Sequence, residues 1–112
     1  MEIRELIIDA NECEGDLNDE KLLLQILISA AKKVEANVVN ALAHKYNPQG
    51  VTVVVLLAES HLSISTWPEF NYANVEIFLC NDSMRPYIVW DEIKSKLKPK
   101  VWKIDEIIHR IE

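Results

Sequence analysis

The sequence predicts an α+β fold, a two-layer α/β sandwich in which two helices cover one face of a mainly antiparallel sheet. The chain has 112 residues, which fits one domain, so we expect residues 1–112 to fold as a single unit. Hydrophobic residues make up 49% of the chain, enough to form one core. Strand-like and helix-like segments follow in the order β-α-β-β-β-β-α-β, which an antiparallel sheet with both helices on one face accommodates.

The first half of the chain contains three strand-like segments and one helix. Residues 3–10 read as the first strand. Asn18 is the expected N-cap of a helix over residues 19–35, where apolar side chains recur at helical spacing. Residues 37–43 follow as a second strand. The nearly all-apolar, β-branched run at residues 51–58 is typical of a strand inside a sheet.

The second half repeats this alternation without a detectable sequence repeat. Alternating apolar and polar side chains predict strands over residues 62–66 and 75–80. Residues 81–83 (Asn-Asp-Ser) form the expected turn and helix cap. The helix then begins near Pro86, since proline is accepted in a first helical turn, and it ends at Pro99.

The last segment, residues 101–108, fits either a strand or a helix. A strand is favoured because no cap precedes the segment and because a strand here would complete the sheet. With both helices on one side, the other face of the sheet stays open and partly apolar. This predicts a homodimer packed through the open sheet face, or a partner protein bound there.

Composition excludes several classes of protein. The net charge of -6 disfavours nucleic-acid binding and suits a small cationic ligand. No apolar run approaches the ~20 residues that span a bilayer, and the first residues lack a signal-peptide pattern, so we expect no membrane association and a cytoplasmic location. Two cysteines and three histidines without ligand spacing predict neither a disulfide scaffold nor a metal site.

Residues 58–70 are the most unusual segment, because polar groups, an aromatic and a carboxylate directly follow the most hydrophobic strand. A nucleophilic serine beside His61 is one interpretation. However, neighbouring side chains on a strand point to opposite faces, and the GxSxG pattern of a nucleophile elbow is absent. From the residues alone, a plain edge strand and turn fits equally well.

The same segment closely resembles the processing site of the small prokaryotic S-adenosylmethionine decarboxylases. Ten of eleven motif positions match over residues 59–69, ESHLSISTWPE. The match continues upstream at residues 44–51 (HKYNPQGV) and downstream at residues 72–80 (YANVEIFLC). The resemblance therefore covers nearly the whole chain, and the order of elements fits as well.

The resemblance implies a proenzyme that cuts itself between Glu59 and Ser60, giving a β chain (1–59) and an α chain (60–112). The Ser60 hydroxyl attacks the Glu59 carbonyl, the resulting ester undergoes β-elimination, and the dehydroalanine hydrolyses to a pyruvoyl group. That cofactor forms a Schiff base with the substrate amine and accepts the electrons left by departing carbon dioxide. In the family the substrate is S-adenosylmethionine and the product donates an aminopropyl group to spermidine.

The resemblance also assigns roles to single residues. Ser60 matches the pyruvoyl precursor, and Cys80 matches the cysteine that reprotonates the carbanion, a task that suits a thiol. Taken alone, Cys80 would read as a small buried hydrophobe on a strand. Thr52 matches a hydroxyl residue that assists processing, usually serine in the family.

Three further residues match the substrate-binding positions. Tyr46 stands where the family usually has phenylalanine, and its ring suits stacking on adenine or on the sulfonium cation. Glu69 matches the carboxylate that accepts hydrogen bonds from the ribose hydroxyls. Asp9 stands where the family tends to carry glutamate.

One position departs from the motif. Ser65 stands where the family has the histidine that acts as the base for β-elimination, taking the α-proton of residue 60. Imidazole, with a pKa near ~6.5, suits this task, whereas an aliphatic hydroxyl needs another base to activate it. His61 points to the same side of an unbroken strand as position 65 and is a candidate substitute base.

Ser65 keeps two alternatives open. The chain could be an unprocessed, non-catalytic paralogue that binds ligand or pairs with an active paralogue as a heterodimer. It could also be a pyruvoyl decarboxylase for another amino acid, such as arginine or ornithine. Tyr46 and Glu69 favour the nucleoside substrate, S-adenosylmethionine.

Overall fold

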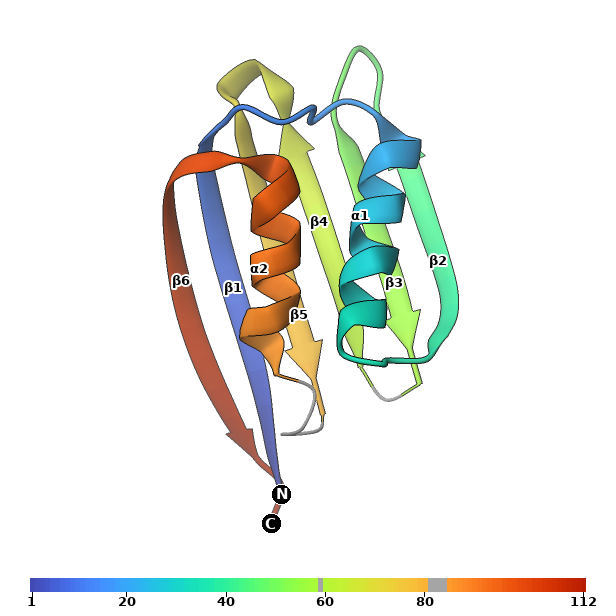
Figure 1. Cartoon of the computed structure of the whole chain (residues 1–112), viewed down its shortest axis with the longest axis vertical. Helices are drawn as coiled ribbons and strands as arrows, with labels where there is room; N and C mark the ends of the chain where they lie inside the picture. The colour runs from blue at the N-terminus through green and yellow to red at the C-terminus, as the bar shows by residue number, and fades with distance from the viewer. Residues whose placement is uncertain (59, 81–84) are drawn as a thin grey trace.

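A computed structural model describes residues 1–58, 60–80 and 85–112 of the chain. Six strands form one antiparallel sheet in the order β2-β3-β4-β5-β1-β6. Both helices lie against the same face of this sheet, one over each half (Figure 1). The α+β two-layer sandwich and the predicted order of elements are therefore confirmed.

Several strands, such as β1 and β6, extend beyond the predicted segments, whereas α1 and β3 end earlier than predicted. The elements are β1 (Glu2–Cys13), α1 (Glu20–Lys33), β2 (Val38–Lys45), β3 (Val51–Leu57), β4 (His61–Trp67), the 3-10 turn η1 (Pro68–Phe70), β5 (Tyr72–Leu79), α2 (Pro86–Leu97) and β6 (Pro99–Arg110). The ambiguous last segment is a strand, as favoured. It pairs with β1 along its length, from Glu2 opposite Arg110 to Cys13 opposite Pro99.

Strand alternation divides the sheet into a buried face and an open face. Side chains such as Leu6, Val53 and Ile77 point toward the helices and are fully buried. On β3 the alternate residues Val54 and Leu56 are 41% and 48% exposed. A strand that reads as continuously apolar is therefore covered on one side only, which leaves apolar surface on the open face.

The N-cap of helix α1 is Asp19, which corrects the predicted N-cap, Asn18. The Asp19 side chain accepts a hydrogen bond from the Leu22 N–H at 3.0 Å, so it satisfies one of the free donors of the first turn. The Asn18 side chain instead accepts a hydrogen bond from the Gly50 N–H at 2.9 Å. This bond joins the loop between β1 and α1 to the turn after β2. Asn18 thus stabilises a tertiary contact rather than the helix.

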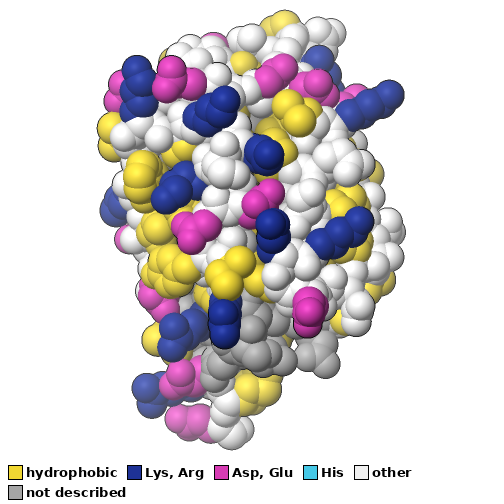
Figure 2. Space-filling view, viewed as in Figure 1, with side chains coloured by type: hydrophobic (Ala, Val, Ile, Leu, Met, Phe, Trp, Pro, Cys, Tyr) yellow, Lys and Arg dark blue, Asp and Glu magenta, His cyan; other side chains and the backbone are white. Residues whose placement is uncertain are grey.

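Helix α2 has Pro86 in its first turn, as predicted. Its inner side buries Trp90, Ile93 and Leu97 against the sheet and α1. The turn and cap predicted at residues 81–83 lie outside the described residues. On the helix-covered side of the molecule, acidic and basic side chains are interspersed, so no field of one sign forms there (Figure 2).

Candidate active site

The β3–β4 hairpin positions Ser60 immediately before the first residue of β4. Its carbonyl oxygen accepts a hydrogen bond from the Leu57 N–H at 2.9 Å, which closes the turn. The Ser60 side chain is only 6% exposed, and its Oγ has no hydrogen-bond partner within the described part of the chain. Glu59, the other residue of the expected cleavage site, lies outside the described residues.

His61 and Cys80 lie at the same end of the sheet as Ser60. The β4–β5 register sets His61 opposite Phe78, and the two rings stack with centroids 5.0 Å apart. Cys80 follows β5 directly and is half-buried. The sequence motif therefore brings the serine, one histidine and the cysteine to adjoining strand ends.

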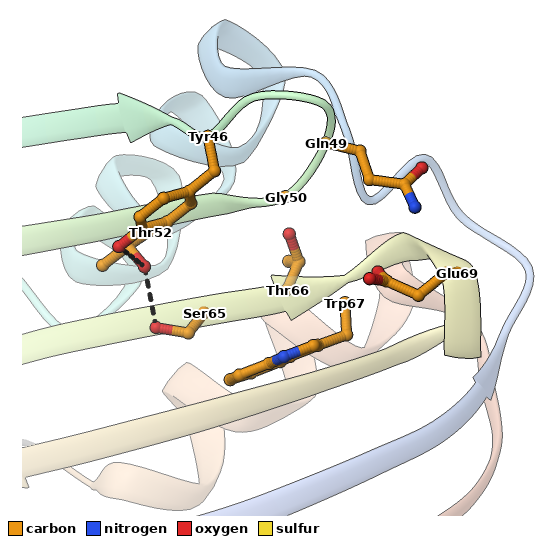
Figure 3. A pocket seen from close by; sticks show the side chains of 8 residues that line it. All are labelled: Tyr46, Gln49, Gly50, Thr52, Ser65, Thr66, Trp67 and Glu69. Atoms are coloured by element: carbon orange, nitrogen blue, oxygen red, sulfur yellow. Dashed lines mark hydrogen bonds between the residues drawn. The ribbon is translucent and has the colours of Figure 1, made fainter.

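A pocket of about 300 Å³ lies at the opposite end of β3 and β4, on the open face. Eight side chains or backbone segments form its walls: Tyr46, Gln49, Gly50, Thr52, Ser65, Thr66, Trp67 and Glu69. Gln49 and Glu69 lie together at one end of the pocket, Tyr46, Thr52 and Ser65 lie at the other, and Thr66 lies between the two groups (Figure 3). An aromatic ring, a carboxylate and several hydroxyls together suit a polar, cationic ligand with an apolar part.

Three hydroxyls in this pocket form a continuous hydrogen-bonded chain. The Tyr46 hydroxyl donates to Thr52 Oγ1 at 3.1 Å, and Thr52 Oγ1 lies 2.9 Å from Ser65 Oγ. Thr52 and Ser65 are directly opposed on β3 and β4 (Figure 3). The expected processing residues Thr52 and Ser65 are thus in direct contact.

Thr66 and Gly50 hold the pocket walls in place from beneath. The buried Thr66 hydroxyl donates to the Leu17 carbonyl at 2.7 Å and accepts from the Val51 N–H at 2.9 Å. Gly50 has a φ of 105°, and a Cβ there would lie 3.1 Å from the Thr66 carbonyl oxygen. A side chain at position 50 would therefore be strained and would crowd the pocket floor.

Asp9 lies on the open face in the same row as Ser65, two strands away. The register joins Ser65 to Asn74 and Asn74 to Asp9, which is about 10 Å at ~4.8 Å per strand. The Tyr72 hydroxyl donates to Asp9 Oδ1 at 2.5 Å. Burial, then the hydrogen bond and negative charge of Asp9, raise the pKa of Tyr72 above its ordinary value.

The expected site residues therefore fall into two groups on one sheet. Ser65 follows Ser60 by five residues along an extended strand, about 17 Å at ~3.3 Å per residue. His61 shares the open face with Ser65, as predicted, but by the same measure lies about 13 Å from it. A single copy of the chain does not bring the serine and cysteine end next to the pocket end.

Some pocket residues were not singled out from the sequence as functional. Gln49 and Trp67 entered the sequence analysis only as parts of the matched segments 44–51 and 59–69. Both become neighbours of Glu69 because β4 ends in η1, which folds back beside the turn after β2. Pro68 follows Trp67 and Gly50 follows Gln49, and such residues mark chain reversals, so these two residues were the available sequence signal.

Within residues 1–58, 60–80 and 85–112, no three His, Cys, Asp or Glu side chains are grouped so that they could hold a metal ion. Neither of the helices described is long and apolar enough to cross a membrane.

The fold and site define a small α+β-sandwich protein with a buried serine at a hairpin turn and a polar pocket on an open sheet face. A family model described as S-adenosylmethionine decarboxylase matches residues 4–110. The chain belongs to the S-adenosylmethionine decarboxylase family.

Individual relatives agree with this assignment. The chain is 42% identical over 95 residues to an S-adenosylmethionine decarboxylase proenzyme of Prochlorococcus marinus, covering 84% of this chain and 76% of the relative. It is 36% identical over 105 residues to one from Methanococcus maripaludis strain S2, covering 93% and 86%. The crystal structure of the adenosylmethionine decarboxylase from Aquifex aeolicus superposes with a TM-score of 0.83 at 30% identity, covering 96% of this chain and 88% of that one.

Proposed function

We propose that the chain is a proenzyme that cuts itself between Glu59 and Ser60 and then decarboxylates S-adenosylmethionine, as a step toward spermidine. The observation that carries this proposal is Ser60 itself. It is buried at the end of a hairpin, its Oγ has no hydrogen-bond partner among the described residues, and it lies in the motif that the family uses for self-cleavage. A buried hydroxyl without a partner is costly, which is consistent with a group kept for chemistry on its own backbone.

The surroundings of residue 60 suit the pyruvoyl group that self-cleavage would leave there. That group supplies an electron sink for decarboxylation. The chain's own residues bind and handle the proton. Cys80, half-buried at the adjoining strand end, is the proposed donor of the proton that replaces carbon dioxide.

We assign substrate binding to the pocket at the other end of β3 and β4. The Tyr46 ring offers a face to the sulfonium or to adenine, and the Glu69 carboxylate offers oxygens to the ribose hydroxyls. Asp9 lies farther along the same row and could bind the amino group of the substrate. The net charge of -6 favours a cationic ligand over an anionic one.

We further propose that the working form is a homodimer packed through the open sheet face. The separation of about 17 Å between Ser60 and Ser65 supports this, because the two groups can meet only across two copies. A twofold axis perpendicular to the strands would set the Ser60 end of one sheet over the pocket end of the other. Exposed apolar side chains on this face, Leu42, Val54 and Leu56, provide contact surface.

Intact-mass measurement of the purified protein under denaturing conditions tests the proposal. The 12.9 kDa chain should split into fragments 1–59 and 60–112, the latter carrying the pyruvoyl mass. Ser60→Ala, which lacks the attacking hydroxyl, should stay whole. A wild-type chain that stays whole, with no release of carbon dioxide from S-adenosylmethionine, would instead favour the non-catalytic paralogue.

A further inference from the structure

The hydroxyl chain in the pocket connects two of the positions at which the sequence differs from the usual family pattern. Tyr46 replaces the usual phenylalanine, and Ser65 replaces the usual histidine. In the structure these two residues are the ends of one hydrogen-bonded series, Tyr46 to Thr52 at 3.1 Å and Thr52 to Ser65 at 2.9 Å. The hydroxyl that Tyr46 adds is thus joined to the hydroxyl that replaces the imidazole.

Two titratable side chains, His44 and Glu69, lie near Tyr46. The ring is 49% exposed, and His44 packs edge-on against it with centroids 4.6 Å apart. Glu69 lines the same pocket from η1, whereas Lys45 lines a different depression. The two central strands contribute hydroxyls rather than charges to this pocket. The phenol is therefore the acidic hydroxyl of the series, because aliphatic hydroxyls do not ionise in water at accessible pH.

We propose that Tyr46, Thr52 and Ser65 form a proton relay for self-processing, in which the Tyr46 phenolate is the final proton acceptor. This inference rests on the proposed function, and the relay acts on residue 60 of the second copy. The chemical problem is the one that Ser65 creates. A serine hydroxyl accepts the α-proton only if its own proton can move on.

At the ester formed at residue 60, the relay transfers three protons in series. Ser65 Oγ takes the α-proton while its own proton passes to Thr52 Oγ1, and the Thr52 proton passes to the phenolate of Tyr46. The electron pair of the broken C–H bond forms the Cα–Cβ double bond. The Cβ–O bond breaks, and its electron pair leaves with the Glu59 carboxylate. One negative charge moves from the phenolate to that carboxylate, and no oxidant or reductant is needed.

Tyr46→Phe tests the relay, because it removes the phenol while keeping the ring. Thr52→Val breaks the series in the middle. Tyr87→Phe is the matched control, since it removes a phenol hydrogen-bonded to Glu106 on the helix-covered side of the sheet. Cleavage is followed by intact mass over time at pH 6 to 9.5. Tyr46→Phe and Thr52→Val should slow cleavage by at least about tenfold at pH 8, and Tyr87→Phe should not.

The pH profile separates the relay from a structural effect. A phenol must lose its proton before it can accept one, so a relay ending on phenolate makes the wild-type rate rise with pH across the tested range. In Ser65→His the rate should level off above pH ~7, and adding Tyr46→Phe should then change it little. Such non-additivity identifies a shared function of the two positions.

Three results would overturn the relay. Wild type and Tyr46→Phe could cleave at equal rates with equal pH slopes. The wild-type rate could level off above neutral pH, which would identify a proton acceptor other than a phenolate. Wild type could stay whole while Ser65→His cleaves, in which case hydroxyls do not suffice but the processing chemistry stands. If neither cleaves, the proposed function itself fails.

Discussion

The Tyr72 hydroxyl donates a hydrogen bond to the Asp9 carboxylate, and this contact favours the neutral form of Tyr72. Burial and the Asp9 carboxylate raise the pKa of Tyr72, so the folded protein favours the neutral phenol. This contribution to stability is complete below the unfolded value of ~10 and is lost as pH rises through the folded value.

We therefore expect the free energy of unfolding to fall between pH 9 and 11, and Tyr72→Phe to reduce that fall. Urea unfolding at several pH values measures it. The fall should not vanish, because the hydrogen bond to Glu106, together with partial burial, also raises the pKa of Tyr87. Identical alkaline slopes in wild type and Tyr72→Phe would contradict the assignment.

At the residue scale, motif matching predicted more of the candidate site than spacing did. Ser60, Thr52, Tyr46 and Glu69 were predicted from the resemblance, whereas the residues alone left segment 58–70 equally consistent with a plain edge strand and turn. The contact between Tyr46 and Thr52 could not be predicted, because it depends on how the chain turns after β2. Tyr46 and Thr52 are six positions apart in sequence, and the β2–β3 hairpin brings their side chains together.

The start of helix α1 leads to a prediction at the scale of the element. Asp19→Ala removes the side chain that caps the Leu22 N–H, and should lower the free energy of unfolding by about 1 kcal/mol. Asp91→Ala is the control, because its pairing with Lys94 is exposed and longer, at 3.8 Å, and should contribute less than about 0.5 kcal/mol. Urea midpoints compare the variants. Equal losses in both would mean that Asp19 acts as a surface charge rather than as a cap.

The elements themselves could largely be predicted, but their ends and neighbours could not. Apolar alternation predicted β4 and β5 because one face of the sheet is buried, whereas β3 was predicted from a continuous apolar run. β1 and β6 run longer than predicted because they pair with each other from Glu2 opposite Arg110 to Cys13 opposite Pro99, and β6 shows no alternation of buried and exposed side chains. The Asn18 cap was wrong because Gly50, distant in sequence, binds that side chain.

The proposed dimer makes a prediction for the whole molecule. A Ser60→Ala chain keeps its pocket, and a Thr52→Val chain keeps its serine. Refolded together, the two defective chains should form a heterodimer in which the intact pocket faces the intact serine. Only the Thr52→Val chain should then be cut, and intact mass distinguishes the two chains.

A chain that carries both substitutions is the control, and it should not rescue Thr52→Val. If Thr52→Val cleaves alone at the wild-type rate, the pocket is not needed. If the wild type cleaves but the mixture does not, the site forms within one copy. The separation of Ser60 from the pocket that contains Ser65 was not predictable from the sequence, because strand register, rather than motif spacing, sets the distance between them.

Strand order determines how fragments 1–59 and 60–112 would be held together after cleavage. Residues 1–59 supply β1, β2 and β3, and residues 60–112 supply β4, β5 and β6. Yet β1 lies between β5 and β6, so the two pieces are interlaced across three strand pairs. Met1 and Ile111 also hydrogen-bond to each other, so the first and last residues of the chain lie side by side. Strands from the two fragments thus pair within one continuous sheet. A circular permutant that joins the old ends and opens between residues 59 and 60 should keep the same topology.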